Sequence, residues 1–425
     1  MSTKRRVVPE VEPSKKAAAH LDMLSARIGM RLVGTPGNRS ATDYVASVIE
    51  GMGLAVECPS FNCLGWDAGE AFLEAGGARL ELKPGPYSLP FEGERLLVAA
   101  SSTEELEACD CSDRILLLHG AIASEPMAPR NYVFYNPEEH RTIHRLLDLK
   151  KPAAVVAATG VCPTTAGAEY PFPLFDDGDF DIPSACTKDV EAARLVAHAG
   201  SRVRLRIESG RREETGCNVI GRLAGTDPGR RIVLTAHIDT RPGTPGALDD
   251  ASGVATILAA AELQASLHHG GVRPGPALEV AILNGEDYYA ASGEMEYMRA
   301  NEERWGGIAF VMNVDGAGYR EGSTAWSLYG CDTRLRRSLR TALGRFPGLV
   351  AGEQWPQGDH SMFAMQGVPA AAFTSDRMAE LWSEVAHTGR DTADLVDPAR
   401  LGELARVLSA IANLRILRGS TFEGG

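Results

Sequence analysis

The second half of the chain alternates short apolar runs with longer segments of helical spacing, and this alternation restricts the folds that the chain can adopt. Continuous apolar strands between amphipathic helices are typical of a mainly parallel sheet that helices cover on its faces. We therefore predict an α/β domain from residue 217 onward. Its predicted strands are residues 218–223, 231–236, 278–283, 308–314 and 370–373, and its predicted helices are residues 252–267, 291–301, 333–343 and 398–417.

The first half of the chain has a different texture. Residues 14–52 carry apolar side chains at helical spacing, with a turn-rich break at residues 34–38. From residue 61 to residue 208, β-like runs alternate with Pro/Gly-rich loops, which indicates a separate β-rich domain with a few helices. We predict one domain from residues 1–60 and 209–425, with residues 61–208 inserted. Within the insert we expect strands at residues 71–82, 114–119, 153–158 and 203–207, and helices at residues 137–149 and after residue 184.

Composition excludes several classes of partner. The 425 residues are 44% apolar and 23% charged, as in soluble proteins of two or three domains. The formal net charge of −13 argues against a nucleic acid or an anionic membrane as partner. The basic N-terminal residues precede no apolar core of a signal peptide, and no stretch approaches the length of a transmembrane helix. We therefore expect a cytoplasmic protein.

The eight cysteines are scattered along the chain and form no C-x-x-C pair, so we expect reduced thiols. Cys109 and Cys111 are close enough in sequence to suggest a metal site. Because no His or Cys pair lies at a matching distance, we interpret them as ordinary thiols.

Histidine and acidic residues stand where the predicted strands end, and ligands of such sheets gather at the carboxyl ends of the strands. The strand at 231–236 leads into His237-Ile-Asp239. Residues i and i+2 share a strand face, so His237 can bind a metal while Asp239 orients its ring. Alone, this pattern is weak.

A glycine-rich turn with two acids, Gly246-Ala-Leu-Asp249-Asp250-Ala-Ser-Gly253, precedes the predicted helix at 252–267. Asp249 can bridge two cations, because a carboxylate has two oxygens. The alternative interpretation is a helix N-cap, for which Asp and Ser are both favoured.

Further carboxylates and a histidine follow later strands. The strand at 278–283 leads into Asn284-Gly-Glu286-Asp287, and adjacent acids at the end of a buried strand are costly unless a positive charge compensates them. One acid can then be a ligand and the other a proton carrier, although a solvated turn is an alternative. Asp315 follows the strand at 308–314, and His387 lies in an acidic loop before the last helix.

Together these segments offer two histidine and three carboxylate ligands and one free glutamate, in the order of successive strands. We predict a two-metal hydrolase on this basis. Mixed imidazole and carboxylate ligation suits zinc, with cobalt or manganese as alternatives. The predicted ligands are His237, Asp249, Asp287, Asp315 and His387.

These motifs resemble those of the di-zinc exopeptidases of metallopeptidase family 28, which include bacterial leucyl aminopeptidases, glutamate carboxypeptidase and, more distantly, glutaminyl cyclase. The resemblance covers most of the chain, and residues 61–208 resemble the protease-associated (PA) domain often inserted in this family. Besides the segments above, Gly34-Thr-Pro-Gly-Asn, Asn313-Val-Asp315, Gly358-Asp359-His360 and His387-Thr-Gly-Arg-Asp391 fall in family order.

The resemblance implies a role for each site residue. Asp249 would bridge two zinc ions, Glu286 would be the general base, and Asp239 would be the outer carboxylate behind His237. One zinc would bind His237, Asp249 and Asp315, and the other would bind Asp249, Asp287 and His387.

The sequence departs from the family pattern at two positions. Asp287 stands where the family usually has Glu, so its carboxylate is one methylene shorter. Trp355 stands where some bacterial relatives have a tyrosine that stabilises the oxyanion. That role falls to the Trp355 indole, which can donate a hydrogen bond, or passes to Tyr288, Tyr289 or Tyr329. His360 lines the site or supports Asp359.

The expected activity is release of N-terminal residues from peptides, as an aminopeptidase or dipeptidase. A carboxypeptidase is the alternative, and it needs a cation for the substrate carboxylate, for which Arg241, Arg320 and Arg390 are candidates. A glutaminyl cyclase is disfavoured by the PA-like insert. A receptor-like binding protein would bind no metal, whereas the enzyme would bind about two ions per chain. A homodimer is expected from the relatives.

Overall fold

The structure is a computed structural model, and it describes residues 12–130, 136–162, 169–272, 275–356 and 358–418. The chain divides into two compact units. The first contains Met1–Phe61, Gly216–Leu381 and Ala386–Gly425, and the second contains Asn62–Thr215 with Trp382–Val385. The main part of the second unit is therefore inserted into the first in sequence.

The first unit is built on a mixed sheet of eight strands in the order β1-β9-β11-β10-β12-β15-β13-β14. Its centre is parallel: β10 pairs with β11 and β12, and β12 pairs with β15. Strands β9 and β13 run antiparallel to their central neighbours. The predicted mixed α/β fold is thus confirmed. The bounds are β1 Ala55–Glu57, β9 Val219–Leu223, β10 Asp227–His237, β11 Pro276–Leu283, β12 Ile308–Val314, β13 Thr324–Tyr329, β14 Leu349–Ala351 and β15 Ala370–Ser375.

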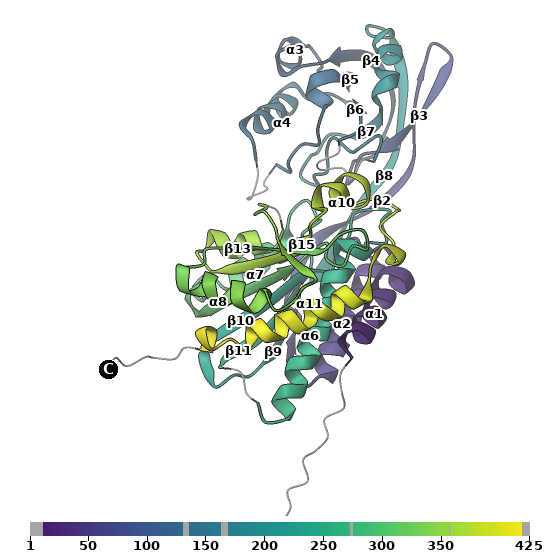
Figure 1. The fold of residues 1–425 in the computed structure, drawn as a ribbon. Coiled ribbons are helices and arrows are strands. Elements are labelled where there is room, and N and C mark those ends of the chain that lie inside the picture. The colour runs from purple at the N-terminus through teal and green to yellow at the C-terminus, as the bar shows by residue number, and fades with distance from the viewer. Residues whose placement is uncertain (1–11, 131–135, 163–168, 273–274, 357, 419–425) are drawn as a thin grey trace, which may run out of the picture. The chain divides into compact units, whose positions relative to one another are not determined.

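Helix α6 (Ser252–His269) is buried nearly all round, because the sheet lies on one side of it and two other helices on the other. Those helices are α1 (Pro13–Leu21) and α11 (Pro398–Ala412), and the three lie side by side (Figure 1). The predicted final helix is shorter than expected, since it ends at Ala412. The other helices of this unit are α2 Pro36–Gly51, α7 Ser292–Ala300, α8 Thr333–Leu343, α9 His360–Met365 and α10 Met378–Glu384, which extends into the second unit.

The N-terminal helical region is divided into three parts. Helix α1 continues into a π-helical segment, Asp22–Ile28, and α2 starts only at Pro36. Thr35 caps α2 by accepting a hydrogen bond from the backbone of Asn38, and Pro36 occupies the first turn, where its missing N–H has no cost. Most of the segment between Ile28 and Pro36 is buried in the interior of the unit.

The second unit is a closed barrel of seven strands in the order β2-β3-β7-β6-β5-β4-β8. Its first two strands correct the prediction of one strand at residues 71–82: they form a hairpin, with Gly76 and Gly77 at positive φ in the turn. The strands are β2 Ser60–Ala75, β3 Ala78–Pro84, β4 Phe91–Ala100, β5 Ile115–Leu118, β6 Ala154–Thr159, β7 Ser184–Lys188 and β8 Arg202–Cys217, and the helices are α3 Thr103–Ala108, α4 Glu138–Lys150 and α5 Ala192–Val196.

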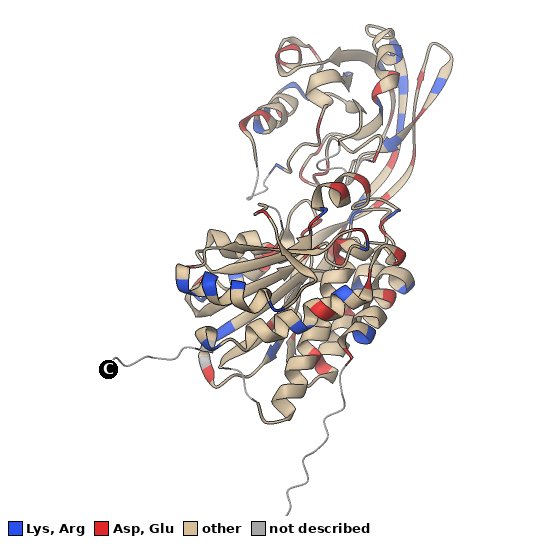
Figure 2. Cartoon of the chain, viewed as in Figure 1, with Lys and Arg blue, Asp and Glu red and all other residues tan. Residues whose placement is uncertain are grey.

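Charged and buried residues alternate along the barrel strands. Figure 2 shows basic and acidic residues side by side along β4 and β8, where Arg202 pairs with Glu94 and Arg204 with Glu92. Val203, which lies between the two arginines in β8, is buried. This period of two is what a strand with one solvated face requires. Across the described part of the chain, no helix is both long and apolar enough to cross a bilayer.

Candidate metal centre

Three loops that carry predicted ligands leave the sheet at the same edge. His237 at the end of β10 pairs in register with Leu283 at the end of β11, and Thr235 pairs with Asn313 of β12. Because these strands are parallel, the residues that follow them meet outside this edge. The loops after β11 and β12 bring Asp287 and Asp315 to the same place as His237.

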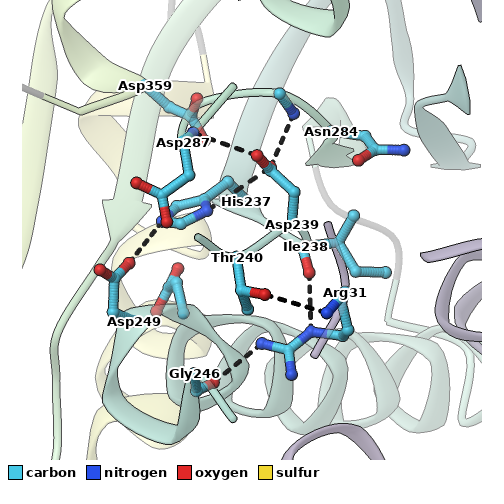
Figure 3. Close-up of polar contacts among 12 residues, drawn as sticks. Arg31, His237, Ile238, Asp239, Thr240, Gly246, Asp249, Asn284, Asp287 and Asp359 are labelled. Atoms are coloured by element: carbon cyan, nitrogen blue, oxygen red, sulfur yellow. Dashed lines mark hydrogen bonds and ion pairs between the residues drawn. The ribbon is translucent and has the colours of Figure 1, made fainter. Parts of the chain in front are cut away.

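The five predicted ligands fall into two groups that share Asp249. Within each group, one side-chain oxygen or nitrogen of each residue lies within 4.8 Å of the others. Figure 3 shows His237 and Asp287 close to Asp249, which approaches from the segment before α6. The groups are His237, Asp249 and Asp315, and Asp249, Asp287 and His387.

Asp249 contacts the two histidines with different oxygens. His237 Nε2 lies 3.0 Å from Oδ1, and His387 Nε2 lies 3.1 Å from Oδ2. His387 Nε2 is also 3.1 Å from Asp287 Oδ1. The His387 side chain is 23% exposed, whereas those of His237, Asp249 and Asp287 are almost fully buried, so solvent reaches the group on the His387 side.

Crowding of acids at this edge shifts their pKa values. Burial, opposed by His237 and reinforced by Asp249, raises the pKa of Asp315 to about 8. Burial also raises the pKa of Glu286 well above its usual range, with Asp287 and Asp315 acting in the same direction against His237. Burial alone would lower the pKa of His387, but the charges of Asp287 and Asp249 raise it to about 10. The site therefore holds more negative charge than its own cations compensate.

The residues fit a metal ion by their donor chemistry. Among the described residues, Asp287 Oδ2 and Asp315 Oδ1 are buried and have no hydrogen-bond partner. Buried polar atoms are normally paired, and an unpaired carboxylate oxygen is especially costly. A divalent cation would satisfy these atoms and offset the surplus charge. Two imidazoles and three carboxylates form a donor set that suits zinc.

The neighbouring Asp250, and not Asp249, has the N-cap role that was the alternative for Asp249. Asp250 Oδ1 accepts a hydrogen bond of 2.8 Å from the backbone N–H of Gly253 in the first turn of α6. The carboxylate of Asp249 is thereby left to face the histidines. Its backbone is held by Asp391, whose two oxygens accept from Leu248 N at 2.7 Å and Asp249 N at 3.0 Å.

Asp239 connects His237 to the loop after β11. Its Oδ1 lies 3.7 Å from His237 Nδ1 and accepts a 2.6 Å hydrogen bond from Gly285 N, and its Oδ2 accepts a 3.1 Å bond from Asp287 N. One buried carboxylate thus faces a predicted ligand ring and fixes the backbone on both sides of Glu286 (Figure 3). The role of Asp239 as the carboxylate behind His237 remains a prediction.

Trp355 is held rigidly beside the site. Its backbone N–H donates to Tyr329 Oη at 2.8 Å, and its carbonyl accepts from the same hydroxyl and pairs with His360 Nε2 at 3.0 Å. The indole ring adjoins Gly358, where a Cβ would meet both the ring and Asp315 Oδ2. Among the described residues, the buried Trp355 Nε1 has no hydrogen-bond partner.

The roles of His360 and Tyr288 at the site remain predictions. His360 is fully buried, and its other ring nitrogen, Nδ1, lies 3.3 Å from Asn313 Nδ2. It therefore contacts both Trp355 and Asn313. Tyr288 is 2% exposed, with its ring against Tyr289.

Several supporting residues were missed by the sequence reasoning. Asp391 and Asn38 appeared there only as parts of motifs, and Arg31 and Glu294 were not considered, although all four are buried next to predicted site segments. Glu294 lies close to Asp359 and Glu286, and burial together with their charges raises its pKa. For Arg31 a signal exists, because it is a lone charge between Met30 and Leu32-Val in an apolar run.

Comparisons with known proteins agree with this geometry. Residues 218–412 match the model of peptidase family M28. The probable lipoprotein aminopeptidase LpqL of Mycobacterium tuberculosis is 24% identical in an alignment covering 90% of this chain and 81% of that protein.

Two solved structures share the fold over nearly the whole chain. An aminopeptidase from Aneurinibacillus sp. strain AM-1 superposes with a TM-score of 0.73 and 20% identity, covering 95% of this chain and 94% of that one. BSAP, a zinc aminopeptidase from Bacillus subtilis, gives a TM-score of 0.72 and 20% identity, covering 96% and 95%. The family expected from the motifs is thus confirmed, while the PA type of the insert remains a prediction. The match to the model of peptidase family M28 extends over residues 218–412, which contain all five candidate metal ligands.

Proposed function

We propose that this protein is a zinc-dependent exopeptidase that releases residues from the N-terminus of peptides. The observation that carries the proposal is the pair of ligand groups sharing Asp249 within the domain of peptidase family M28. The names of the relatives support the direction of cleavage, since LpqL and BSAP are both described as aminopeptidases and BSAP as a zinc enzyme. A carboxylate-rich site also suits a substrate with a free amine.

Two ions are proposed, one in each group, with zinc as the native metal and cobalt or manganese as alternatives. His237, Asp249 and Asp315 would hold the first, and Asp249, Asp287 and His387 the second. Such cations lower the pKa of a shared water and polarise a peptide carbonyl. The shorter Asp287 in place of Glu makes the second group the more variable in metal preference.

Glu286 is the proposed general base. It belongs to neither ligand group, it is partly buried beside them, and Asp239 holds the backbone on either side of it. Glu286 would take a proton from the attacking water and return it to the leaving amine. Asp239 would keep the His237 ring in the orientation that ligation requires.

Trp355 is the proposed donor to the oxyanion. Its indole N–H is buried without a partner among the described residues, and its ring lies near Asp315 across Gly358. Tyr329, one of the alternatives, commits its hydroxyl to both backbone groups of Trp355. A preorganised donor of this kind costs no rearrangement when charge develops in the transition state.

A carboxypeptidase is the second candidate, because one arginine approaches the second ligand group. Arg241 Nε lies 3.5 Å from Asp287 Oδ1, and its side chain is 30% exposed. Arg320 instead donates to the carbonyls of Asp394 and Val396, and Arg390 is exposed. Arg241 is therefore the residue of the three that best fits a substrate carboxylate.

A cytoplasmic location, a homodimer and a PA-type insert remain predictions. One relative does not support the cytoplasmic location, since LpqL is described as a lipoprotein. A peptide substrate is supported by the family.

Peptides that are blocked at one terminus distinguish the aminopeptidase from the carboxypeptidase. We expect cleavage of a peptide with a free amine and an amidated C-terminus, and no cleavage of an N-acetylated peptide with a free carboxylate. The measurement is product analysis by mass spectrometry with zinc, manganese or cobalt added, and with a dipeptide included. Cleavage of the N-acetylated peptide at its C-terminal bond would favour the carboxypeptidase.

Asp249→Asn should abolish most of the stabilisation by zinc, because the Asp249 carboxylate belongs to both groups. The measurement is Tm in chelator and in zinc, with metal content of about two ions per wild-type chain. Asp332→Asn is the control, since Asp332 caps α8 through Leu335 N and should keep the zinc-dependent rise in Tm. A wild-type chain without bound zinc would instead support a binding protein.

Glu286→Gln should lower kcat by about 10²- to 10⁴-fold, because the amide cannot accept the proton. Bound zinc should not change, since Glu286 is in neither group. The measurements are steady-state kinetics and metal content. Glu296→Gln in α7, where the carboxylate pairs with Arg299, should remain active. Near-normal turnover of Glu286→Gln would refute the assignment.

Trp355→Phe should lower kcat by about 10- to 1000-fold while zinc content is retained, because an aromatic ring remains but the indole N–H is lost. The control is Trp326→Phe in β13, whose ring packs under Arg340. Equal kcat in the two variants would show that Trp355 acts by packing alone.

A further inference from the structure

Arg31 is a fully buried arginine that follows the π-helical segment of the N-terminal region. Its guanidinium donates five hydrogen bonds, all to backbone carbonyls. Nε donates to Ile238 at 2.8 Å, Nη1 to Leu24, Gly29 and Pro245 at 3.0, 2.8 and 2.8 Å, and Nη2 to Gly246 at 2.8 Å. The Arg31 backbone N–H also donates to Thr240 Oγ1 at 2.9 Å (Figure 3).

Three of the acceptors, Ile238, Pro245 and Gly246, lie at the two ends of the segment that connects His237 to Asp249, and the other two lie in the N-terminal region itself. Ile238 lies between His237 and Asp239, and Gly246 begins the segment that leads to Asp249. Gly246 has a φ of 61°, and a Cβ there would lie 2.3 Å from Thr240 Cγ2 and 2.9 Å from Arg31 Nη2. One planar guanidinium therefore fixes the distance between His237 and the bridging carboxylate.

A second side chain extends this connection to the third loop. Asn38 of α2 donates from Nδ2 to the Arg31 carbonyl and to Asn284 Oδ1, both at 2.8 Å, and accepts from Asn284 Nδ2 at 2.9 Å. Asn284 directly precedes Gly285, Glu286 and Asp287. Through the side chain of Asn284, the N-terminal region thus contacts the loop after β11, which carries Glu286 and Asp287.

This arrangement is costly without a compensating role. None of the hydrogen bonds of Arg31 goes to a carboxylate, although a buried charge is usually paired. Burial lowers the pKa of Arg31 to about 10, against the more distant charges of Asp391 and Asp239. A packed apolar side chain could fill this volume without desolvating a charge. The guanidinium supplies instead a rigid fork of donors.

We propose that Arg31 is a positioning residue of the metal centre, and that it couples docking of the N-terminal region (residues 13–51) to metal binding. This inference rests on the proposed zinc site. The N-terminal region lies outside residues 218–412, which the family model matches, yet it holds the loops on which the ligands stand. Metal binding and N-terminal docking must then stabilise each other by the same free energy.

Arg31→Lys separates geometry from charge. Lysine keeps the positive charge but has its donors on one nitrogen, so it cannot span the carbonyls at both ends of the segment between His237 and Asp249. A matched control is Arg231→Lys, since Arg231 lies in β10 before His237. Arg231 is also largely buried, with Nε 3.4 Å from Glu279 Oε2 and a bond from Nη2 to Asn301.

Zinc affinity, measured by competition with a chelator, tests the proposal without relying on activity. We expect Arg31→Lys to weaken zinc binding about 10- to 100-fold, as supporting residues of metal sites do. Arg231→Lys should lower Tm in chelator but keep the wild-type affinity. Equal affinities in wild type and Arg31→Lys would overturn the proposal, and so would equal losses in the two variants. A wild-type chain that binds no zinc would overturn the proposed function itself.

Hydrogen exchange of the wild-type chain gives a second test that does not depend on a variant folding. Zinc should slow exchange in α1 and α2 as well as in the loops after β10 and β11, and it should leave the barrel strands unchanged. Slower exchange confined to the loops would show that docking and metal binding are not coupled, while leaving the zinc site itself intact.

Discussion

The parallel pairing of β10 with β11 and β12 is the constraint on which the site depends. Since all three strands end at one edge, the residues that follow them must share a small volume, whatever their separation in sequence. Three acids and a histidine brought together in this way repel or neutralise one another unless a cation joins them. The excess of negative charge at this edge therefore follows from the sheet topology. The proposed hydrolytic chemistry depends on the cations that this charge would bind.

Support for the ligands comes from buried hydrogen bonds to the backbone. Asp391 holds the segment of Asp249, Asp239 holds the loop of Asp287, and Arg31 joins the two ends of the segment between His237 and Asp249. Each of these groups fixes main chain, so it limits how far a ligand can move even when no ion is present. Preorganisation of this kind is what keeps a metal site selective and its water correctly placed.

The sequence allowed prediction of the central strands and the five convergent site residues, because apolar runs and polar strand ends are local signals. It did not reveal the short strand β14 or the hairpin at Gly76, where the pattern is brief or interrupted. Arg31 was missed for another reason: its partner Ile238 is 207 residues away, and no local pattern records such a contact. Likewise, the sequence does not show whether a neighbour accepts a hydrogen bond from the indole N–H of Trp355, because that depends on the fold.

The pairing of β1 with β9 has a consequence for how such a chain can evolve. Glu57 lies opposite Ile220, and Asn218 N donates to the Pro59 carbonyl at 3.1 Å, so the chain leaves the sheet and returns to it at adjacent points. The whole inserted barrel occupies the place of a hairpin loop. Because the entropy of closing a loop grows only slowly with its length, a module of this size can be gained, lost or exchanged there without rerouting any strand of the host sheet.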